Sequence, residues 1–418
     1  DQRTDELFFG NLFLTSYWVL FSAAVFLSRS EKMSDGPRAV FASLNNGAYF
    51  ALVILSMLHV NHGNFWKFSL GFGAVLLSLS LLARRVLPRE SALKNAYLTQ
   101  GLLLVTVGLI AYFTGLKLAL VLAAESVVLF LLASQRNNPL LRAGGLLTAT
   151  LAVAWGFSGL KKEPAELWLG TAVGALVIVN ACIARRYDAK LNEGSLRPEP
   201  AYFSALGLLM WLVTTWENCP REWLGPVLAL EALLFTGSFY LLKVREITLF
   251  GQGYLVLAQI FWLVEALSKN PARPWWNPVI IIAATLAISH WWQRQTALYV
   301  NRETRNHFQG VFALAVVGIL FFWLHPTFDP AVWLAFTSLL AIGITLYGLV
   351  TRAWFLAIFG QFFLLVSAWE FVHQLLTGKP EWYFAFAPVA ALLALAFVGA
   401  SWFERHAGEK GETGDVIG

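Results

Sequence analysis

The sequence predicts an all-α integral membrane protein, and its composition is the first reason. Of its 418 residues, 58% are hydrophobic and only 13% are charged, and the mean hydropathy is positive. A soluble globular protein carries about 25% charged residues, so this chain has too little polar surface for soluble domains. The net charge of +5 is spread along the chain. It favours a membrane-loop bias over a nucleic-acid-binding surface.

The second reason is a series of apolar segments, each of which has about the 20 residues that a helix needs to cross a bilayer. We identify about fifteen of them, each followed by a short polar connection. They lie near residues 8–28, 39–59, 66–83, 95–114, 116–134, 140–158, 166–184, 200–216, 223–242, 247–267, 275–293, 307–325, 331–350, 353–374 and 382–403.

The connections alternate in charge, which predicts the orientation. One alternating set, including "ARRVLPRESALK" and "ARRYDAKLNEGSLRPE", carries most of the 30 Lys and Arg residues. The positive-inside rule places this set in the cytoplasm of a bacterial inner membrane. We therefore expect Asp1 outside and the C-terminus in the cytoplasm. Tryptophans that open spans on the other side, such as Trp66 and Trp168, fit interfacial anchors.

The third reason is an internal repeat. The stretch "LVLAAESVVLF" at 120 is followed by "PVLALEALLFT" at 226 and by "VWLAFTSLLAI" at 332, so each step is 106 residues. Glu125, Glu231 and Thr337 occupy the same place in these stretches. Repetition at a fixed period is typical of chains built from stacked structural units.

The repeat predicts units of four helices with a period of about 106 residues. Because four spans return the chain to the same side, these are parallel repeats and not inverted ones. The predicted divisions are a partial repeat of three spans at 1–94, repeats at 95–199, 200–305 and 306–404, and a flexible cytoplasmic tail at 405–418. The partial repeat lacks its first helix and the chain does not begin with Met, so we expect residues upstream of Asp1.

Small residues recur on one face of the second helix of each repeat. At spacings of four and three residues they share a helix face, and such residues let helices approach closely in lipid. We call this face the small-residue seam and interpret it as a packing surface. Its members are Ala119, Ala123, Ser126, Gly225, Ala229, Ala232, Ala331, Ala335 and Ser338.

The intramembrane carboxyl groups of Glu125 and Glu231 have two interpretations. A charge at the centre of a bilayer is costly, by roughly 2.5–3.5 kcal/mol on insertion scales, so it needs a partner or a cavity. Each carboxyl is either a hydrogen-bonded link between helices or part of a cation, proton or polar-substrate site. Thr337 in the third repeat favours the link, since a ring of carboxylates would use every repeat. Gln252 and Gln361 are further intramembrane polar candidates, most simply explained by bonds between helices.

A polar group near the predicted outer ends of the third helices consists of Glu265, Glu370 and His373. Glu370 and His373 are three residues apart, so they can pair on one helix face. We weigh an outward-facing polar site against ordinary solvated helix ends. The sequence contains no catalytic motif, no metal-ligand spacing and no cofactor motif that we can identify, so we expect no catalytic residue, no metal and no cofactor.

The run "LLLVTVGLIAYFTGLKLALVLAAESVVLFLLASQRNNPLLRAGGLLTATLAV" resembles the large bacterial membrane protein family named domain of unknown function 2339. The resemblance lies in a very short outer turn, "TGLK", followed by a span with the pair Ala124–Glu125 and a basic inner loop, "SQRNNPLLR". The second repeat contains "LALEALLF" around Glu231. The resemblance implies a repeated, many-span architecture and assigns no activity.

Two functions follow from these patterns. The first is a transporter or flippase-like protein for a polar or envelope-related solute, suggested by the many spans and the two glutamates. The alternative is a structural or assembly subunit of a larger membrane complex, suggested by the parallel repeats and short loops. The expected partners are the lipid bilayer and, for the alternative, other membrane subunits. We expect no nucleic acid and favour a protein that is not an enzyme.

Overall fold

The computed structural model describes residues 2–27, 34–60, 65–136, 139–162, 167–187, 198–268, 274–295, 302–377 and 386–406. Helices account for nearly all of these residues, and no strand occurs among them. Helices are expected because a backbone in lipid must satisfy its own hydrogen bonds, which an α-helix does within one segment.

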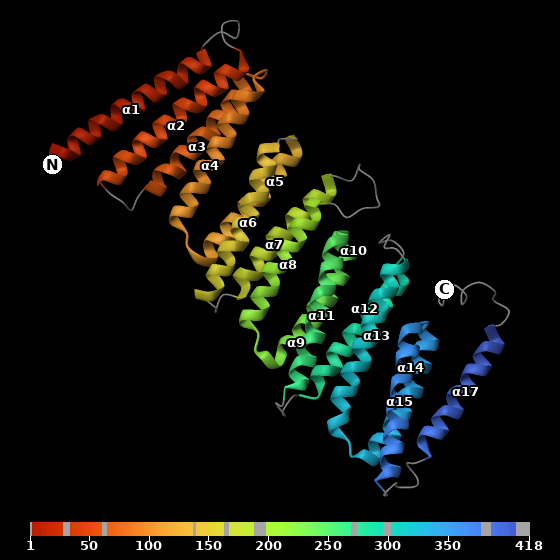
Figure 1. Cartoon of the computed structure of the whole chain (residues 1–418). Coiled ribbons are helices and arrows are strands. Elements are labelled where there is room, and N and C mark those ends of the chain that lie inside the picture. Colours follow the sequence, from red (N-terminus) through yellow and green to blue (C-terminus); the bar gives the residue numbers. More distant parts are fainter. Residues whose placement is uncertain are drawn as a thin grey trace. The chain divides into compact units, whose positions relative to one another are not determined.

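A helix lies over each of the fifteen predicted spans, and the ninth span divides into two helices (Figure 1). In chain order they are α1 (Gln2–Leu27), α2 (Asp35–Val60), α3 (Phe65–Val86), α4 (Ser91–Tyr112), α5 (Gly115–Arg136), α6 (Pro139–Lys162), α7 (Leu167–Tyr187), α8 (Pro198–Asn218), α9 (Arg221–Gly237), α10 (Phe239–Leu242), α11 (Arg245–Leu267), α12 (Trp276–Arg294), α13 (Arg302–Leu324), the 3₁₀ turn η2 (His325–Thr327), α14 (Pro330–Thr351), α15 (Trp354–Leu376) and α17 (Ala387–His406).

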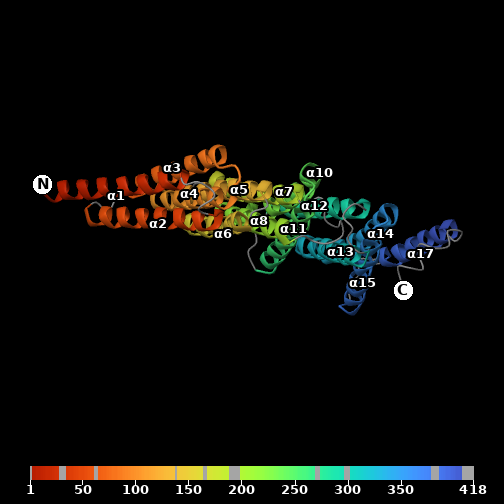
Figure 2. The ribbon, with the colours of Figure 1, turned by 90° about the horizontal axis from the view of Figure 1, so that it is seen from above.

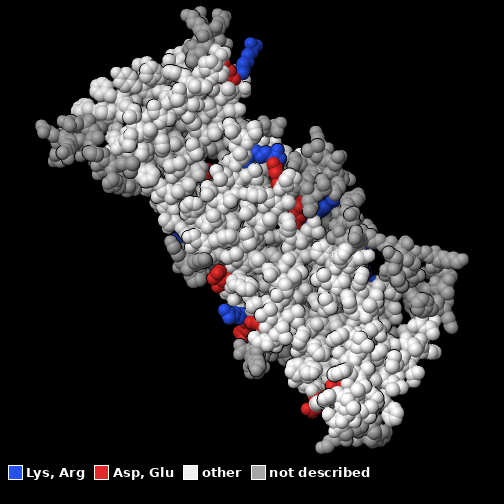
Figure 3. Space-filling view, viewed as in Figure 1, with Lys and Arg blue, Asp and Glu red and all other residues white. Residues whose placement is uncertain are grey.

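Within the described residues, twelve helices are long and apolar enough to cross a membrane. α8 and α12 fall outside this set, and α17 contributes a shorter apolar stretch, Ala387–Ser401. Figure 3 shows a face that is almost entirely uncharged, with Lys, Arg, Asp and Glu confined to small patches. The fold class predicted from the sequence, an all-α membrane protein, is confirmed.

The chain divides into two compact units. The first comprises Asp1–Leu191 with Arg197–Asn218 and holds α1 to α8, and the second comprises Asn192–Leu196 with Cys219–Gly418 and holds α9 to α17. The boundary falls after α8, inside the predicted repeat 200–305. The reason is that α8 packs against α6 and α7, the helices of the preceding repeat. The predicted repeats and their divisions stay a prediction.

Two helix pairs of the first unit approach so closely that only glycine fits at their crossings. A Cβ atom added at Gly101 on α4 would lie 3.1 Å from the carbonyl oxygen of Gly73 on α3. One added at Gly207 on α8 would lie 2.8 Å from the carbonyl oxygen of Gly174 on α7. Close backbone approach supplies the van der Waals contact that associates helices in lipid.

Other helices of the first unit also pack in pairs. α5 packs closely on α6, and α1 lies beside α2, as Figure 2 also shows. The turn between α4 and α5 requires a glycine, since Gly115 has φ 58°, a left-handed conformation that other residues rarely adopt. That turn brings Glu125 on α5 back alongside α4.

In the second unit the helix boundaries give a register for the last two predicted repeats. α9 begins at Arg221 and α14 at Pro330, while α11 begins at Arg245 and α15 at Trp354. Both differences are 109 residues (330 − 221 and 354 − 245), three more than the 106 suggested by the sequence of the second helix. With an offset of 109, Leu340 takes the place equivalent to Glu231, and Thr337 does not.

We predict that Gly207→Ala destabilises the protein, because the added methyl group meets the Gly174 carbonyl oxygen and the helices must separate. Overpacking of this kind costs about 1–3 kcal/mol. Gly253→Ala on α11 is the matched control, because a Cβ there meets no heavy atom within 4 Å. We expect it to leave stability unchanged or raise it by about 0.5–1 kcal/mol through helix propensity. Thermal unfolding in detergent measures the stability of both variants. Equal stability of the two would contradict the close approach of α7 and α8 at this crossing.

Candidate functional site

Glu125 is held by a hydrogen bond from the neighbouring helix. Its side chain is buried on α5, and its Oε1 accepts a hydrogen bond from the hydroxyl of Thr106 on α4. Thr106 can also donate to the carbonyl oxygen of Leu102 within its own helix, at 3.0 Å. The geometry places a polar bridge between α4 and α5, and the two interpretations of this carboxyl remain those given by the sequence.

Glu231 and Thr337 lie in the second unit, apart from Glu125 in the first. Glu231 is partly buried on α9. Thr337 is completely buried on α14, where its hydroxyl lies 2.9 Å from the Trp333 carbonyl oxygen of the same helix. Thr337 therefore bonds within its own helix, whereas Glu125 bonds to a neighbour.

The two glutamines make matching bonds between helices. Gln252 Nε2 on α11 donates to Thr236 Oγ1 on α9 at 3.1 Å, and Gln361 Nε2 on α15 donates to Thr345 Oγ1 on α14 at 2.6 Å. Each glutamine lies 16 residues after its threonine, and each pair is separated from the other by 109 residues. These bonds therefore repeat the register given by the helix boundaries.

The structure buries most of the small-residue seam. Ala119, Ala123 and Ser126 are completely buried, as are Ala229 and Ala232. Gly225 is also buried, while Ala335 is partly buried, and the side chain of Ala331 lies outside the described residues.

The serines of this seam also make polar contacts. Ser126 Oγ accepts a hydrogen bond from Asn180 Nδ2 on α7 at 2.8 Å, and Ser338 Oγ lies 2.6 Å from Ser367 Oγ on α15. The seam therefore combines close packing with hydrogen bonds to adjacent helices.

The outer polar residues do not form a shared site among the described contacts. Glu370 accepts a hydrogen bond from Gln374 Nε2 at 3.0 Å, and His373 on the same helix α15 is exposed. Glu265 lies on a different helix, α11. No group of three or more His, Cys, Asp or Glu residues able to hold a metal occurs in the described part of the chain.

Two ion pairs between helices were not identified from the sequence. Arg38 on α2 binds Glu90 before α4, and Arg142 on α6 binds Glu199 at the start of α8. Beside the first pair, Asp35 accepts backbone N–H groups at the start of α4 and so caps that helix. In both cases the arginine is the fourth residue of its helix. This shared position was the signal in the sequence that could have indicated the two ion pairs.

An apolar groove in the second unit has the form of a ligand site. Residues of α12, α13, α14 and α15 line it, including Ile282, Leu320, Phe336, Leu340 and Gly343. Its volume is about 280 Å³, close to the lower end of the ~300–1,000 Å³ typical of small-ligand pockets. Leu340, the residue equivalent to Glu231 in the register above, forms part of its wall. By this offset, an apolar space lies where the predicted earlier repeats carry a glutamate.

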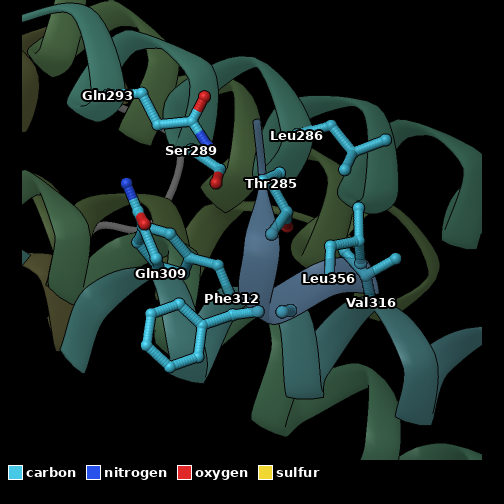
Figure 4. A pocket seen from close by; sticks show the side chains of 11 residues that line it. Thr285, Leu286, Ser289, Gln293, Gln309, Phe312, Val316 and Leu356 are labelled. Atoms are coloured by element: carbon cyan, nitrogen blue, oxygen red, sulfur yellow. The ribbon is translucent and has the colours of Figure 1, made fainter. Parts of the chain in front are cut away.

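One end of the groove is polar. A smaller pocket of about 10 Å³ shares Leu286, Val316 and Leu356 with the groove. Figure 4 shows these side chains at one end of this pocket and Ser289, Gln293 and Gln309 at the other. The groove and the pocket together offer an apolar length with a polar end, the form of an amphiphilic molecule.

The polar end is connected to the groove wall by hydrogen bonds. His290 Nε2 lies 2.9 Å from Tyr347 Oη, and Tyr347 lines the groove. His290 Nδ1 lies 3.3 Å from Gln293 Oε1, and Gln293 lines the polar pocket. The polar pocket lies near the connection between α12 and α13, which the charge bias predicts to be cytoplasmic. This site could not be predicted from the sequence, because its members come from four helices and are mostly aliphatic.

Comparisons with family models, with curated proteins and with solved structures find no match to this chain.

We predict that Arg38→Ala strongly destabilises the protein. The Arg38 side chain is completely buried and that of Glu90 is 10% exposed, so the substitution leaves a buried carboxylate without its cation. Such a loss costs about 3–5 kcal/mol. Arg142→Ala is the matched control, because its side chain is 41% exposed and solvent screens the pair. We expect a cost below about 1 kcal/mol there. Similar losses in unfolding free energy would show that burial does not distinguish the two pairs.

We predict that Cys219, between α8 and α9, reacts with a membrane-impermeant maleimide added outside intact cells. Burial, and secondarily the charge of Glu231, raise the pKa of this thiol above its ordinary value near 9. Because the thiolate is the reactive form, labelling should be slow at neutral pH and accelerate as the pH rises. Cys219→Ser is the control. Labelling of Cys219 only after cells are permeabilised would reverse the predicted orientation.

Proposed function

We propose that this polytopic membrane protein is a transporter or flippase-like protein that moves an amphiphilic, envelope-related solute. The observation that carries the proposal is the groove between α12, α13, α14 and α15, with its polar end. A ligand site in a helical membrane protein is expected between helices, apolar for most of its length and with a few polar groups that fix orientation. The groove has this composition.

The loose packing around the groove supports movement of a molecule along it. α13 packs on α12 and α15 less extensively than α7 packs on α8 in the first unit. Gly318 on α13 and Gly343 on α14 both have open space where a Cβ would lie, unlike the glycines at the tight crossings. A site that admits and releases a solute needs space of this kind between helices.

The intramembrane glutamates support the proposal less than the sequence suggested. Glu125 accepts a hydrogen bond from Thr106 in the first unit, and neither Glu231 nor Thr337 lines the groove. We therefore assign the solute to the groove and leave Glu125 as a link between α4 and α5.

The alternative, a structural or assembly subunit of a larger membrane complex, is favoured by the first unit. Its glycine crossings and buried ion pair hold helices tightly. Membership of the family named domain of unknown function 2339 also remains a proposal, carried by the Ala124–Glu125 pair and its flanking loops.

The test is transport in vesicles that contain the purified chain and a phospholipid with a fluorescent NBD group on its acyl chain. Dithionite added outside bleaches only the outer leaflet unless the protein moves the probe. We expect faster bleaching of the inner pool with the wild-type chain and a large loss with Gly343→Phe, which fills the groove without meeting a neighbouring atom at its Cβ.

Gly318→Phe is the matched control, because it adds the same side chain to open space on α13 outside the groove lining. It should transport like the wild type. Bleaching no faster than in protein-free vesicles, or equal rates for the two phenylalanine variants, would remove the transport proposal and favour the structural subunit.

A further inference from the structure

The polar end of the groove indicates the chemistry of the headgroup. We propose that it binds one oxygen of an anionic, phosphate-bearing lipid headgroup, while a hydrocarbon chain of the same lipid lies in the groove. This inference rests on the proposed function, because it concerns the same groove, and it adds the class of ligand. Three features carry it: a buried amide N–H without a partner among the described residues, an arginine one helical turn from a residue that lines the polar pocket, and the small volume of that pocket.

The amide of Gln293 is oriented by its neighbours. Its Oε1 lies 3.3 Å from His290 Nδ1, and an amide oxygen can only accept, so Nδ1 donates this hydrogen bond. The opposite end of the amide, Nε2, is a donor. Gln293 Nε2 is buried and has no hydrogen-bond partner among the residues that the structure describes. A buried donor without a partner is costly, by about 1–3 kcal/mol, and an oxygen from a ligand would satisfy it.

Other donors converge on the same place. Ser289 lies one helical turn before Gln293 on α12, and Gln309 faces them from α13 (Figure 4). Arg305 lies one turn before Gln309 on the same face of α13.

The charge around this end favours an anion. Arg305 makes no ion pair with any residue that the structure describes, and no Asp or Glu lines the groove or the polar pocket. Arginines with neutral N–H and O–H donors match the geometry and charge of phosphate oxygens. A cationic headgroup would find no carboxylate among these lining residues.

The size of the polar pocket limits what enters it. Its volume of about 10 Å³ is about the room that one water molecule needs, so it admits one oxygen and excludes a whole headgroup. The larger groove shares Leu286, Val316 and Leu356 with it and is lined along α14 from Phe336 to Tyr347. A phosphate oxygen at Gln293 therefore leaves the ester-linked chain positioned to enter the groove.

The experiment compares hexadecyl phosphate with hexadecanol, which has the same chain and no charge. Binding of each to the purified full chain in detergent is followed by the intrinsic fluorescence of its tryptophans. We expect the phosphate to bind about tenfold more tightly than the alcohol, since hydrogen bonds to charged groups are the stronger ones. Gln293→Glu, which places a carboxylate against the phosphate, and Arg305→Gln should each remove most of this preference. Neither should change the affinity for hexadecanol.

Gly343→Phe separates the two proposals. It should weaken the binding of both probes, because the added side chain blocks the groove in which their hydrocarbon chain would lie. Loss of the preference in either headgroup variant, with hexadecanol binding retained, supports the phosphate site. If hexadecanol binds as tightly as the phosphate, or if both headgroup variants keep the preference, the headgroup inference is overturned. The groove still stands in that case, provided that Gly343→Phe weakens both probes. If Gly343→Phe weakens neither, no chain lies in the groove and both proposals fail.

Discussion

Helix association without a hydrophobic driving force is the constraint on which this structure depends. Lipid tails are as apolar as leucine, so helices in a bilayer gain little by burying aliphatic side chains against each other. Close backbone contact and hydrogen bonds between helices must therefore supply the free energy of helix association. The first unit uses glycine for contact, at Gly73 with Gly101 and at Gly174 with Gly207. It uses polar side chains for the bonds, as from Asn180 to Ser126 and from Thr106 to Glu125.

The second unit solves the same problem with amides. Gln252 and Gln361 each bond a threonine on the adjacent helix, and Gln259 Nε2 donates to Thr285 Oγ1 on α12 at 2.9 Å. These bonds secure α11 to α9 and α12, and α15 to α14. No comparable bond between side chains joins α13 to α14 among the described residues. The groove lies in this part of the second unit, between α12, α13, α14 and α15.

The fold was largely predictable because its strongest determinant, long apolar segments, is local in the sequence. The matching glutamines and the small-residue seam were visible for the same reason, since each lies at a fixed spacing within a helix. The register of the third repeat could not be predicted. The segment "LAFTSLL" matches the earlier small residues at an offset of 106, whereas the helix boundaries differ by 109. The groove could not be predicted from the sequence either. Leu286, Val316 and Leu356 look like any membrane-facing residues until three helices bring them together.

The 109-residue offset between helices of the second unit gives the glutamate position a second interpretation. In the first unit Glu125 accepts a hydrogen bond from Thr106 on the neighbouring helix α4. At the position that this offset makes equivalent, Leu340 lines the groove. A buried carboxyl needs a partner, so it draws two helices together, whereas a leucine in lipid is satisfied by any hydrocarbon. Replacing the carboxyl removes the requirement for protein contact and lets a lipid chain take its place. The same position of the predicted repeat would thus hold a link between helices in one copy and the wall of the proposed binding groove in another.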